Sequence, residues 1–224
     1  MENNNITVHN VNPIPIMKID LLDSEQITLE ELKIIQQVSV GTNGDFIISG
    51  TARLIEDYHL DRLGKILDKY ADLYIKKLIG IDNNFSRIHS WLTIHSGDTG
   101  HHKHSHNNAL VAVTLYLDDE LSSEPMTPLH VEIPGTNTIF QNFKFRYNIK
   151  DLNWYTWNEY ILFPKTNRLF IFPAWLTHWV PRPEHKQIHN PRRICIGANY
   201  FLNDLIDIKH DNAPKINNIN IRVN

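Results

Sequence analysis

The pattern of hydrophobic and polar positions predicts helices in the first part of the chain. Within residues 55–79, leucine and tyrosine recur at steps of three and four residues, which gives an α-helix a single apolar face. Gly80 is well placed to end this helix. A shorter helix is predicted within residues 28–40, because Thr28 and Glu31 have the spacing of a capping box. The apolar stripe of the longer helix consists of Leu60, Leu63, Leu67, Tyr70, Tyr74 and Leu78.

From residue 86 onward the pattern changes to short runs of β-branched and aromatic residues, separated by Pro, Asn and Gly. Residues 86–96 alternate around a tryptophan, and residues 109–117 are continuously apolar, as in a strand buried on both faces. Upstream, two prolines within residues 11–21 favour an edge strand or an extended arm. Residues 41–45 favour a turn. Further strands are expected in PLHVEIP, TIFQNFKFRYNI, YILFP, RLFIFP and RRICIGANYFL.

Helices followed by a block of strands predict an α+β fold that is mainly β. Its antiparallel sheets are expected to form a sandwich or a jelly roll, with the N-terminal helices packed on one sheet. The 224 residues suit one domain. We expect an arm and helices over residues 1–85, a β core over 86–204 and a tail over 205–224.

Composition and charge exclude several classes of function. The formal net charge of -3 gives no electrostatic reason to expect a nucleic acid or an anionic membrane as partner. No apolar run approaches the roughly 20 residues that span a bilayer, and the first residues lack a signal-peptide pattern. We therefore expect a soluble cytoplasmic protein. A single cysteine, Cys195, rules out an internal disulfide and a zinc site built from cysteines.

Histidine is the unusual component of this composition, with 13 copies, and four of them crowd into GHHKHSH. If this segment is extended, His104 and His106 point to one side and can bind one metal. His102 has the same parity and is an alternative first ligand. Far downstream, His178 ends an apolar run. Two close ligands and one distant ligand suit a non-haem iron site, although such a segment can also be a solvated loop and His178 a core residue.

Arg193 opens a predicted strand shortly after His178. A guanidinium binds a carboxylate through two parallel hydrogen bonds and keeps its charge when buried. The alternative is an ordinary surface ion pair with Glu184 or Asp204. Arg192 is adjacent, but strand alternation sends only one of the two arginines inward.

Three motifs in order, over residues 86–201, resemble the Fe(II)- and 2-oxoglutarate-dependent oxygenases. The similarity is to a branch from bacteria, marine microbes and their phages that has H-x-H in its first motif. The first motif is Trp91 followed by His104-Ser105-His106, the Asn107-Asn108 gap and the strand that carries Tyr116. The second is FPAWLTH, which ends at His178, and the third is Arg193 at the start of a strand ending in Asn199.

This resemblance implies a jelly roll (double-stranded β-helix) and a hydroxylase that couples decarboxylation of 2-oxoglutarate to oxidation of a C–H bond. It implies that His104 and His178 bind Fe(II). It also implies that Arg193 holds the distal carboxylate of 2-oxoglutarate and that Tyr116 donates a hydrogen bond to it. The substrate is expected to be a small molecule or a peptidyl group, and the resemblance does not identify it.

His106 is the departure from the wider superfamily, which carries Asp or Glu at this position. The resemblance implies that His106 is the third iron ligand. The alternatives are Asp98 from the preceding turn and a water in an open coordination position.

Other functions compete with this one. Three histidines on iron also suit a cupin-type dioxygenase that needs no 2-oxoglutarate, but that function leaves an inward Arg193 unexplained. A binding or structural jelly roll without enzymatic activity predicts that the histidines do not converge. A zinc hydrolase lacks a motif-placed carboxylate base. Residues 118–160 are expected to shape the substrate mouth, with Trp154, Tyr155 and Trp157 packed at its rim.

Overall fold

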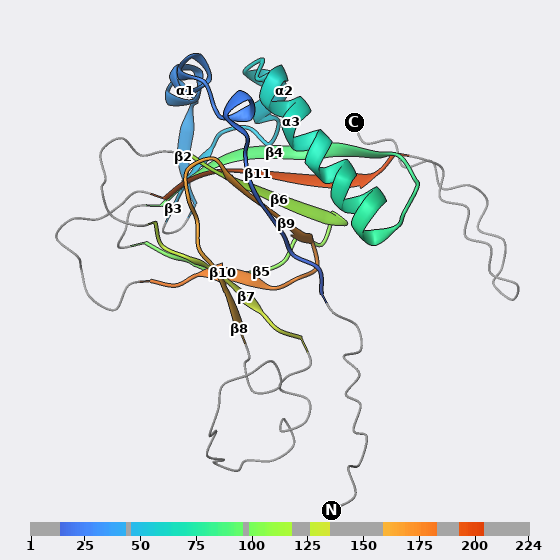
Figure 1. The fold of residues 1–224 in the computed structure, drawn as a ribbon. Helices are drawn as coiled ribbons and strands as arrows, with labels where there is room; N and C mark the ends of the chain where they lie inside the picture. Colours follow the sequence, from blue (N-terminus) through green and yellow to red (C-terminus); the bar gives the residue numbers. More distant parts are fainter. Residues whose placement is uncertain are drawn as a thin grey trace, which may run out of the picture.

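The computed structural model describes residues 14–43, 46–95, 99–117, 126–134, 159–182 and 193–203. In this part of the chain, two antiparallel sheets face each other, and helices cover the outer side of the larger one (Figure 1). The helices are η1 (Asp23–Glu25), α1 (Leu29–Gln36), α2 (Leu54–Asp57), α3 (Asp61–Asp72) and η2 (Leu73–Ile79).

The larger sheet has seven strands and contains most of the predicted β core. Its strands are β1 (Met17–Asp20), β2 (Val40–Asn43), β3 (Phe46–Ser49), β4 (Phe85–His95), β6 (Val111–Tyr116), β9 (Arg168–Pro173) and β11 (Arg193–Leu202). Across the sheet they lie in the order β1, β9, β6, β11, β4, β3, β2. The smaller sheet has the order β5, β10, β7, β8 for β5 (His101–His104), β7 (Leu129–Glu132), β8 (Glu159–Leu162) and β10 (His178–Val180).

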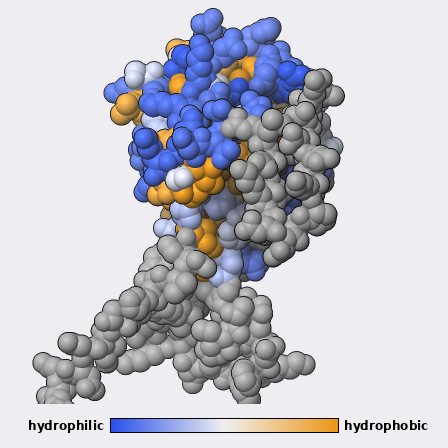
Figure 2. All heavy atoms as spheres, turned by 90° about the vertical axis from the view of Figure 1, so that its right-hand side faces the viewer, coloured by the Kyte–Doolittle hydropathy of each residue, from blue (hydrophilic) through white to orange (hydrophobic). Residues whose placement is uncertain are grey.

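Two hydrophobic clusters hold these layers together. One lies between the helices and the larger sheet, where Leu63 and Leu67 of α3 meet Leu92 and Ile196 of the sheet. The other lies between the two sheets and includes Phe172. The first cluster confirms the predicted packing of the helices on one sheet. On the face of the molecule in Figure 2, hydrophilic side chains dominate the upper part, and hydrophobic side chains gather lower down.

The capping box at α1 forms as predicted. The Thr28 hydroxyl accepts from the backbone N–H of Glu31 at 3.2 Å, and the Glu31 carboxylate accepts from the backbone N–H of Thr28 at 2.9 Å. The proline-containing arm also behaves as predicted, because β1 pairs with β9 at the edge of the larger sheet.

The continuous helix predicted over residues 55–79 is wrong. It is interrupted between α2 and α3 near His59, whose φ of 54° is left-handed, and its last part is the π-helix η2. A π-helix has more residues per turn than an α-helix, so the apolar stripe shifts. Ile75 is buried there while Leu78 is 50% exposed, against the expected stripe. Gly80 ends the segment with a φ of 82°, as predicted.

The turn predicted over residues 41–45 is wrong for residues 41–43, which belong to β2 and pair with β3. All four residues of β2 are exposed, so no apolar alternation marks this strand in the sequence. The strand predicted in TIFQNFKFRYNI lies outside the described residues, as does most of the segment 118–160. Among the described helices, none is both long and apolar enough to cross a membrane.

Candidate functional site

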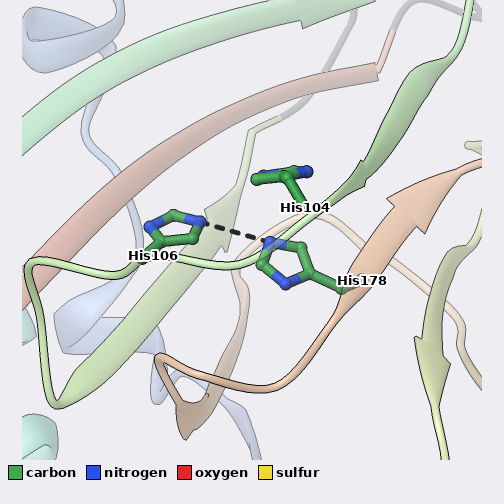
Figure 3. Close-up of side chains that lie close together, drawn as sticks. All are labelled: His104, His106 and His178. Carbon is green, nitrogen blue, oxygen red and sulfur yellow. Dashed lines mark hydrogen bonds between the residues drawn. The ribbon is translucent and has the colours of Figure 1, made fainter.

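Three histidines converge between the two sheets. His104 is the last residue of β5 and lies opposite His178, the first residue of β10. His106 follows β5 in the chain, and its Nε2 lies 3.2 Å from Nε2 of His178. The potential ligand nitrogens of the three residues all lie within 4.8 Å of one another. Figure 3 shows the three rings turned toward a common point.

The expected reason for this convergence is only partly right. The prediction placed His104 and His106 on one face of a single strand, but β5 ends at His104. His106 is fixed by its backbone instead, since its N–H donates to the carbonyl of Ala174 in the segment before His178 at 2.8 Å. His102 is not part of the cluster. Asp98 lies outside the described residues.

Two of the rings are oriented by backbone carbonyls. Nδ1 of His104 lies 2.9 Å from the carbonyl oxygen of His102, and Nδ1 of His178 lies 2.8 Å from that of Leu176. A carbonyl oxygen only accepts hydrogen bonds, so each Nδ1 carries the proton. Each Nε2 therefore presents a lone pair, which is the form of imidazole that binds a metal.

Burial keeps the cluster uncharged at neutral pH. It lowers the pKa of His178 to about 3 and that of His106 to about 4, with smaller effects from neighbouring histidines. It also lowers the pKa of His104. Each neutral ring therefore carries a single proton and keeps its other nitrogen free for a metal. Two nitrogens that bind one ion at about 2.1 Å and at a right angle lie about 3.0 Å apart, close to the separation of Nε2 in His106 and His178.

Arg193 and Tyr116 form a second polar group on the larger sheet. Arg193 is the first residue of β11 and only 3% exposed, and Tyr116 is fully buried. One guanidinium N–H donates to the Tyr116 hydroxyl at 3.0 Å, and another points to Cys195 Sγ at 3.7 Å. Burial raises the pKa of the Tyr116 hydroxyl to about 12, so it stays protonated.

The charge of Arg193 has no counter-ion among the described residues. A guanidinium remains ionised when buried, and an unpaired buried charge is costly. The Nε–H of Arg193 also has no hydrogen-bond partner. The suggested surface partners Glu184 and Asp204, and the neighbouring Arg192, lie outside the described residues.

His95, which the sequence analysis did not select, lies beside Arg193. It is the residue of β4 that pairs with Arg193 in β11, and it is 1% exposed. Neither of its ring nitrogens has a hydrogen-bond partner. Burial, and then the charge of Arg193, lower its pKa to about 3. Among the described residues, these two nitrogens and Nε of Arg193 are the buried side-chain nitrogens or oxygens without a partner.

The two polar groups lie next to each other. The ring of His101 lies 5.7 Å from the ring of His95 and 4.1 Å from the ring of His104, measured between centroids. The charge of Arg193 also contributes to the lowered pKa of His178. The parity of β4 was a usable signal for His95, since it points to the same side as Trp91.

Trp91 forms a further wall of this region. Its ring centroid lies 5.5 Å from that of His106, and the residue also lines a pocket of about 350 Å³. The pocket is lined by Ile48, Ser49, Gly50, Thr51, Ala52, His89 and Trp91. Trp154, Tyr155 and Trp157, predicted to pack at the rim, lie outside the described residues.

Gly197→Ala is expected to destabilise the protein by about 1–3 kcal/mol, because overpacking forces a shift of backbone or side chains. Gly197 pairs with Trp91 across β4 and β11, and a Cβ at this position would overlap the indole ring. Urea unfolding measures the effect, and Gly41→Ala is the control because open space surrounds that glycine. Equal unfolding midpoints for the two variants would contradict the expected overlap.

Comparisons with known proteins agree with this geometry. Residues 89–199 match a sequence family described as "Putative 2OG-Fe(II) oxygenase". The matched range begins just before Trp91 and contains all three histidines, Tyr116 and Arg193. No curated protein matches the chain significantly.

Solved structures show a similar fold at low sequence identity. An oxidoreductase of the 2OG-Fe(II) oxygenase family from Burkholderia pseudomallei has a TM-score of 0.54 at 10% identity, over 83% of each chain. A prolyl-4-hydroxylase from Pseudomonas putida has a TM-score of 0.50 at 10% identity, over 84% of this chain and 93% of its own. HygX from Streptomyces hygroscopicus, solved with nickel, 2-oxoglutarate and hygromycin B, has a TM-score of 0.50 at 12% identity, over 84% of this chain and 82% of its own.

These similarities confirm the mainly β jelly roll, and the family match confirms the resemblance read from the three motifs. An enzyme of this kind uses Fe(II) and 2-oxoglutarate, and the converging imidazoles and the unpaired guanidinium suit that pair. The chain therefore belongs to the Fe(II)- and 2-oxoglutarate-dependent oxygenases.

Proposed function

We propose that His104, His106 and His178 bind the Fe(II) of this oxygenase, and that Arg193 and Tyr116 hold the distal carboxylate of 2-oxoglutarate. The reaction we infer is hydroxylation of a C–H bond in a small molecule or a peptide. The observation that carries the proposal is the fully buried charge of Arg193, which has no carboxylate partner among the described residues and lies near three converging imidazoles.

The protein's own contribution is binding and orientation. Three neutral imidazoles supply nitrogen ligands whose lone pairs are directed inward by hydrogen bonds at Nδ1. When bound, Fe(II) and 2-oxoglutarate would supply the oxidising chemistry together with dioxygen, one oxygen atom of which converts the cosubstrate to succinate and CO2 while the other enters the C–H bond. His178 and Tyr116 are buried, whereas His104 and His106 are partly exposed.

The cosubstrate subsite is explained by its unsatisfied donors. A carboxylate beside Arg193 would accept from the free Nε–H and from the guanidinium that now contacts Tyr116. His95, neutral and without a partner, supplies one more N–H on the same side. An anion in this position would offset the buried positive charge, which apolar packing does not.

The competing functions are less well supported. A three-histidine dioxygenase that acts without 2-oxoglutarate leaves the charge of Arg193 without a purpose. A zinc hydrolase needs a carboxylate base, whereas the described cluster consists of histidines. We further propose that residues 1–224 form one functional unit, because β1, β2 and β3 of the N-terminal part belong to the same sheet as β4 and β11.

Addition of Fe(II) and 2-oxoglutarate to the purified protein without oxygen is expected to produce the weak visible charge-transfer band of an iron chelate. Succinate, which has no keto group to chelate with, is the control and should give no band. Iron binding without a band would contradict the cosubstrate assignment and favour the three-histidine dioxygenase. Absence of iron binding would contradict the metal assignment.

A further inference from the structure

The third histidine of the cluster differs from the other two in what orients its ring. Nδ1 of His106 lies 2.8 Å from Oδ1 of Asn199, a side chain, whereas His104 and His178 are oriented by backbone carbonyls. Asn199 is 7% exposed and lies on β11, where it pairs with His89 of β4. The register of the two strands shifts immediately after it, and a bulge of this kind redirects side chains.

An amide offers the ring of His106 two different partners. With Oδ1 toward the ring, Nδ1 carries the proton, and Nε2 presents a lone pair to the cluster. With the amide reversed, Nδ2 donates to Nδ1, and the proton then sits on Nε2. A backbone carbonyl does not offer this second arrangement, so His106 is the member of the cluster whose tautomer a side chain decides.

The second arrangement has a specific consequence in this structure. Nε2 of His106 lies 3.2 Å from Nε2 of His178, and the hydrogen bond that Figure 3 marks between them requires a proton on one of these two nitrogens. His178 presents a lone pair there, because its Nδ1 donates to the carbonyl of Leu176. An N–H on His106 would therefore bond directly to His178 and occupy both nitrogens. That internal hydrogen bond competes with metal binding.

We propose that Asn199 is a positioning residue that holds His106 in its metal-binding tautomer and prevents the His106–His178 hydrogen bond from closing the site. This inference rests on the proposed metal site. It assigns to Asn199 a function that its position in the motif does not reveal, and β11 in fact continues past this residue to Leu202. It also predicts that an acceptor, and not merely a polar group, is needed at position 199.

The test compares Asn199→Leu, which cannot accept, with Asn199→Asp, which can only accept. Asn203→Leu, at the exposed residue just after β11, is the matched control. Fe(II) affinity is measured without oxygen by titration calorimetry, and the tautomer of His106 in the metal-free protein by ¹⁵N NMR of the ring nitrogens. Loss of a hydrogen bond to a ligating histidine typically costs 10- to 100-fold in metal affinity, so we expect a decrease of about this size in Asn199→Leu.

Asn199→Asp should keep at least the wild-type affinity and retain the proton on Nδ1 of His106, because a carboxylate accepts at both oxygens. In Asn199→Leu the ring nitrogens should show the Nε2–H tautomer. Wild-type affinity and an unchanged tautomer in Asn199→Leu would overturn the inference. If that variant does not fold, a weakened affinity in folded Asn199→Asp overturns it equally. A wild-type protein that binds no iron would instead refute the proposed function.

Discussion

His178→Ala is expected to abolish iron-dependent decarboxylation of 2-oxoglutarate while the protein keeps its fold. Removal of a partner that only orients a metal-binding histidine already costs 10- to 100-fold in affinity, so removal of the ligand itself should exceed about 100-fold. Nε2 of His178 lies 3.2 Å from Nε2 of His106, and alanine at position 178 supplies no nitrogen there. Iron affinity and succinate release are the measurements.

The fold should survive because His178 contributes little to the network of strands. The alanine variant loses the hydrogen bond from Nδ1 to the Leu176 carbonyl and packing against Phe172, while the backbone pairing of β10 with β5 and β7 needs no imidazole. An unsatisfied buried carbonyl costs about 1–3 kcal/mol, which shifts the unfolding midpoint without preventing folding.

His130→Ala is the matched control for this variant. His130 lies in the same sheet on the neighbouring strand β7, and its Nδ1 bonds to Glu159 at 3.1 Å, away from the metal cluster. Turnover should therefore be unchanged. If His178→Ala retained wild-type turnover, or if His130→Ala lost it equally, the proposed ligand set would be wrong.

The sequence is sufficient to identify those site residues that belong to a motif of fixed spacing. His104 and His106 stood out by their separation of two, and Arg193 by its position at the start of an apolar strand. The structure brings the three predicted histidines together and buries the guanidinium against Tyr116. The oxygenase family and the jelly roll followed from the order of these motifs and are confirmed.

The sequence is insufficient to identify site residues whose surroundings depend on pairing between strands that are distant in the chain. The parity of β4 places His95 on the same side as Trp91, but only the pairing of β4 with β11 places it opposite Arg193. Asn199 gains its contact with His106 only because residues 93 positions apart in the chain meet between the sheets. Local patterns cannot report such pairs, because they do not say which distant segment a strand will pair with.

Short or irregular elements were missed for a different reason. The strand β10 has three residues and shows no apolar alternation by which strands are recognised, whereas β5 belongs to the segment expected to be extended but ends at His104. The sequence predicts α-helix over the π-helix η2 because the first residues of η2 continue the same periodicity, and the burial of Ile75 in place of Leu78 marks the change.

Arg193→Gln is expected to raise the concentration of 2-oxoglutarate needed for half-maximal turnover, with a smaller effect on the rate at saturation. Removal of one partner from a buried, hydrogen-bonded charge pair costs about 2–5 kcal/mol, equivalent to roughly 30-fold to a few thousand-fold in affinity. The glutamine keeps a donor for the Tyr116 hydroxyl but carries no charge to attract the distal carboxylate.

The measurement is a 2-oxoglutarate titration of the charge-transfer band without oxygen, followed by succinate release in air. Arg168→Gln is the control, because Arg168 lies on β9 in a partly exposed ion pair with Asp20. Iron affinity in the absence of 2-oxoglutarate should stay the same in both variants, which separates loss of the cosubstrate from loss of the metal.

The two halves of the site are thus tested independently. A variant at position 193 that still requires 2-oxoglutarate at the wild-type concentration would move the carboxylate subsite elsewhere, and Arg192 would be the next residue to replace. The expected result, a weakened cosubstrate on an intact iron site, would explain why an ionised side chain is buried beside His95 with its Nε–H unpaired. In that case the energetic cost of burying the guanidinium is offset when the cosubstrate arrives, because the charge and the free donors meet an anion only in the complex.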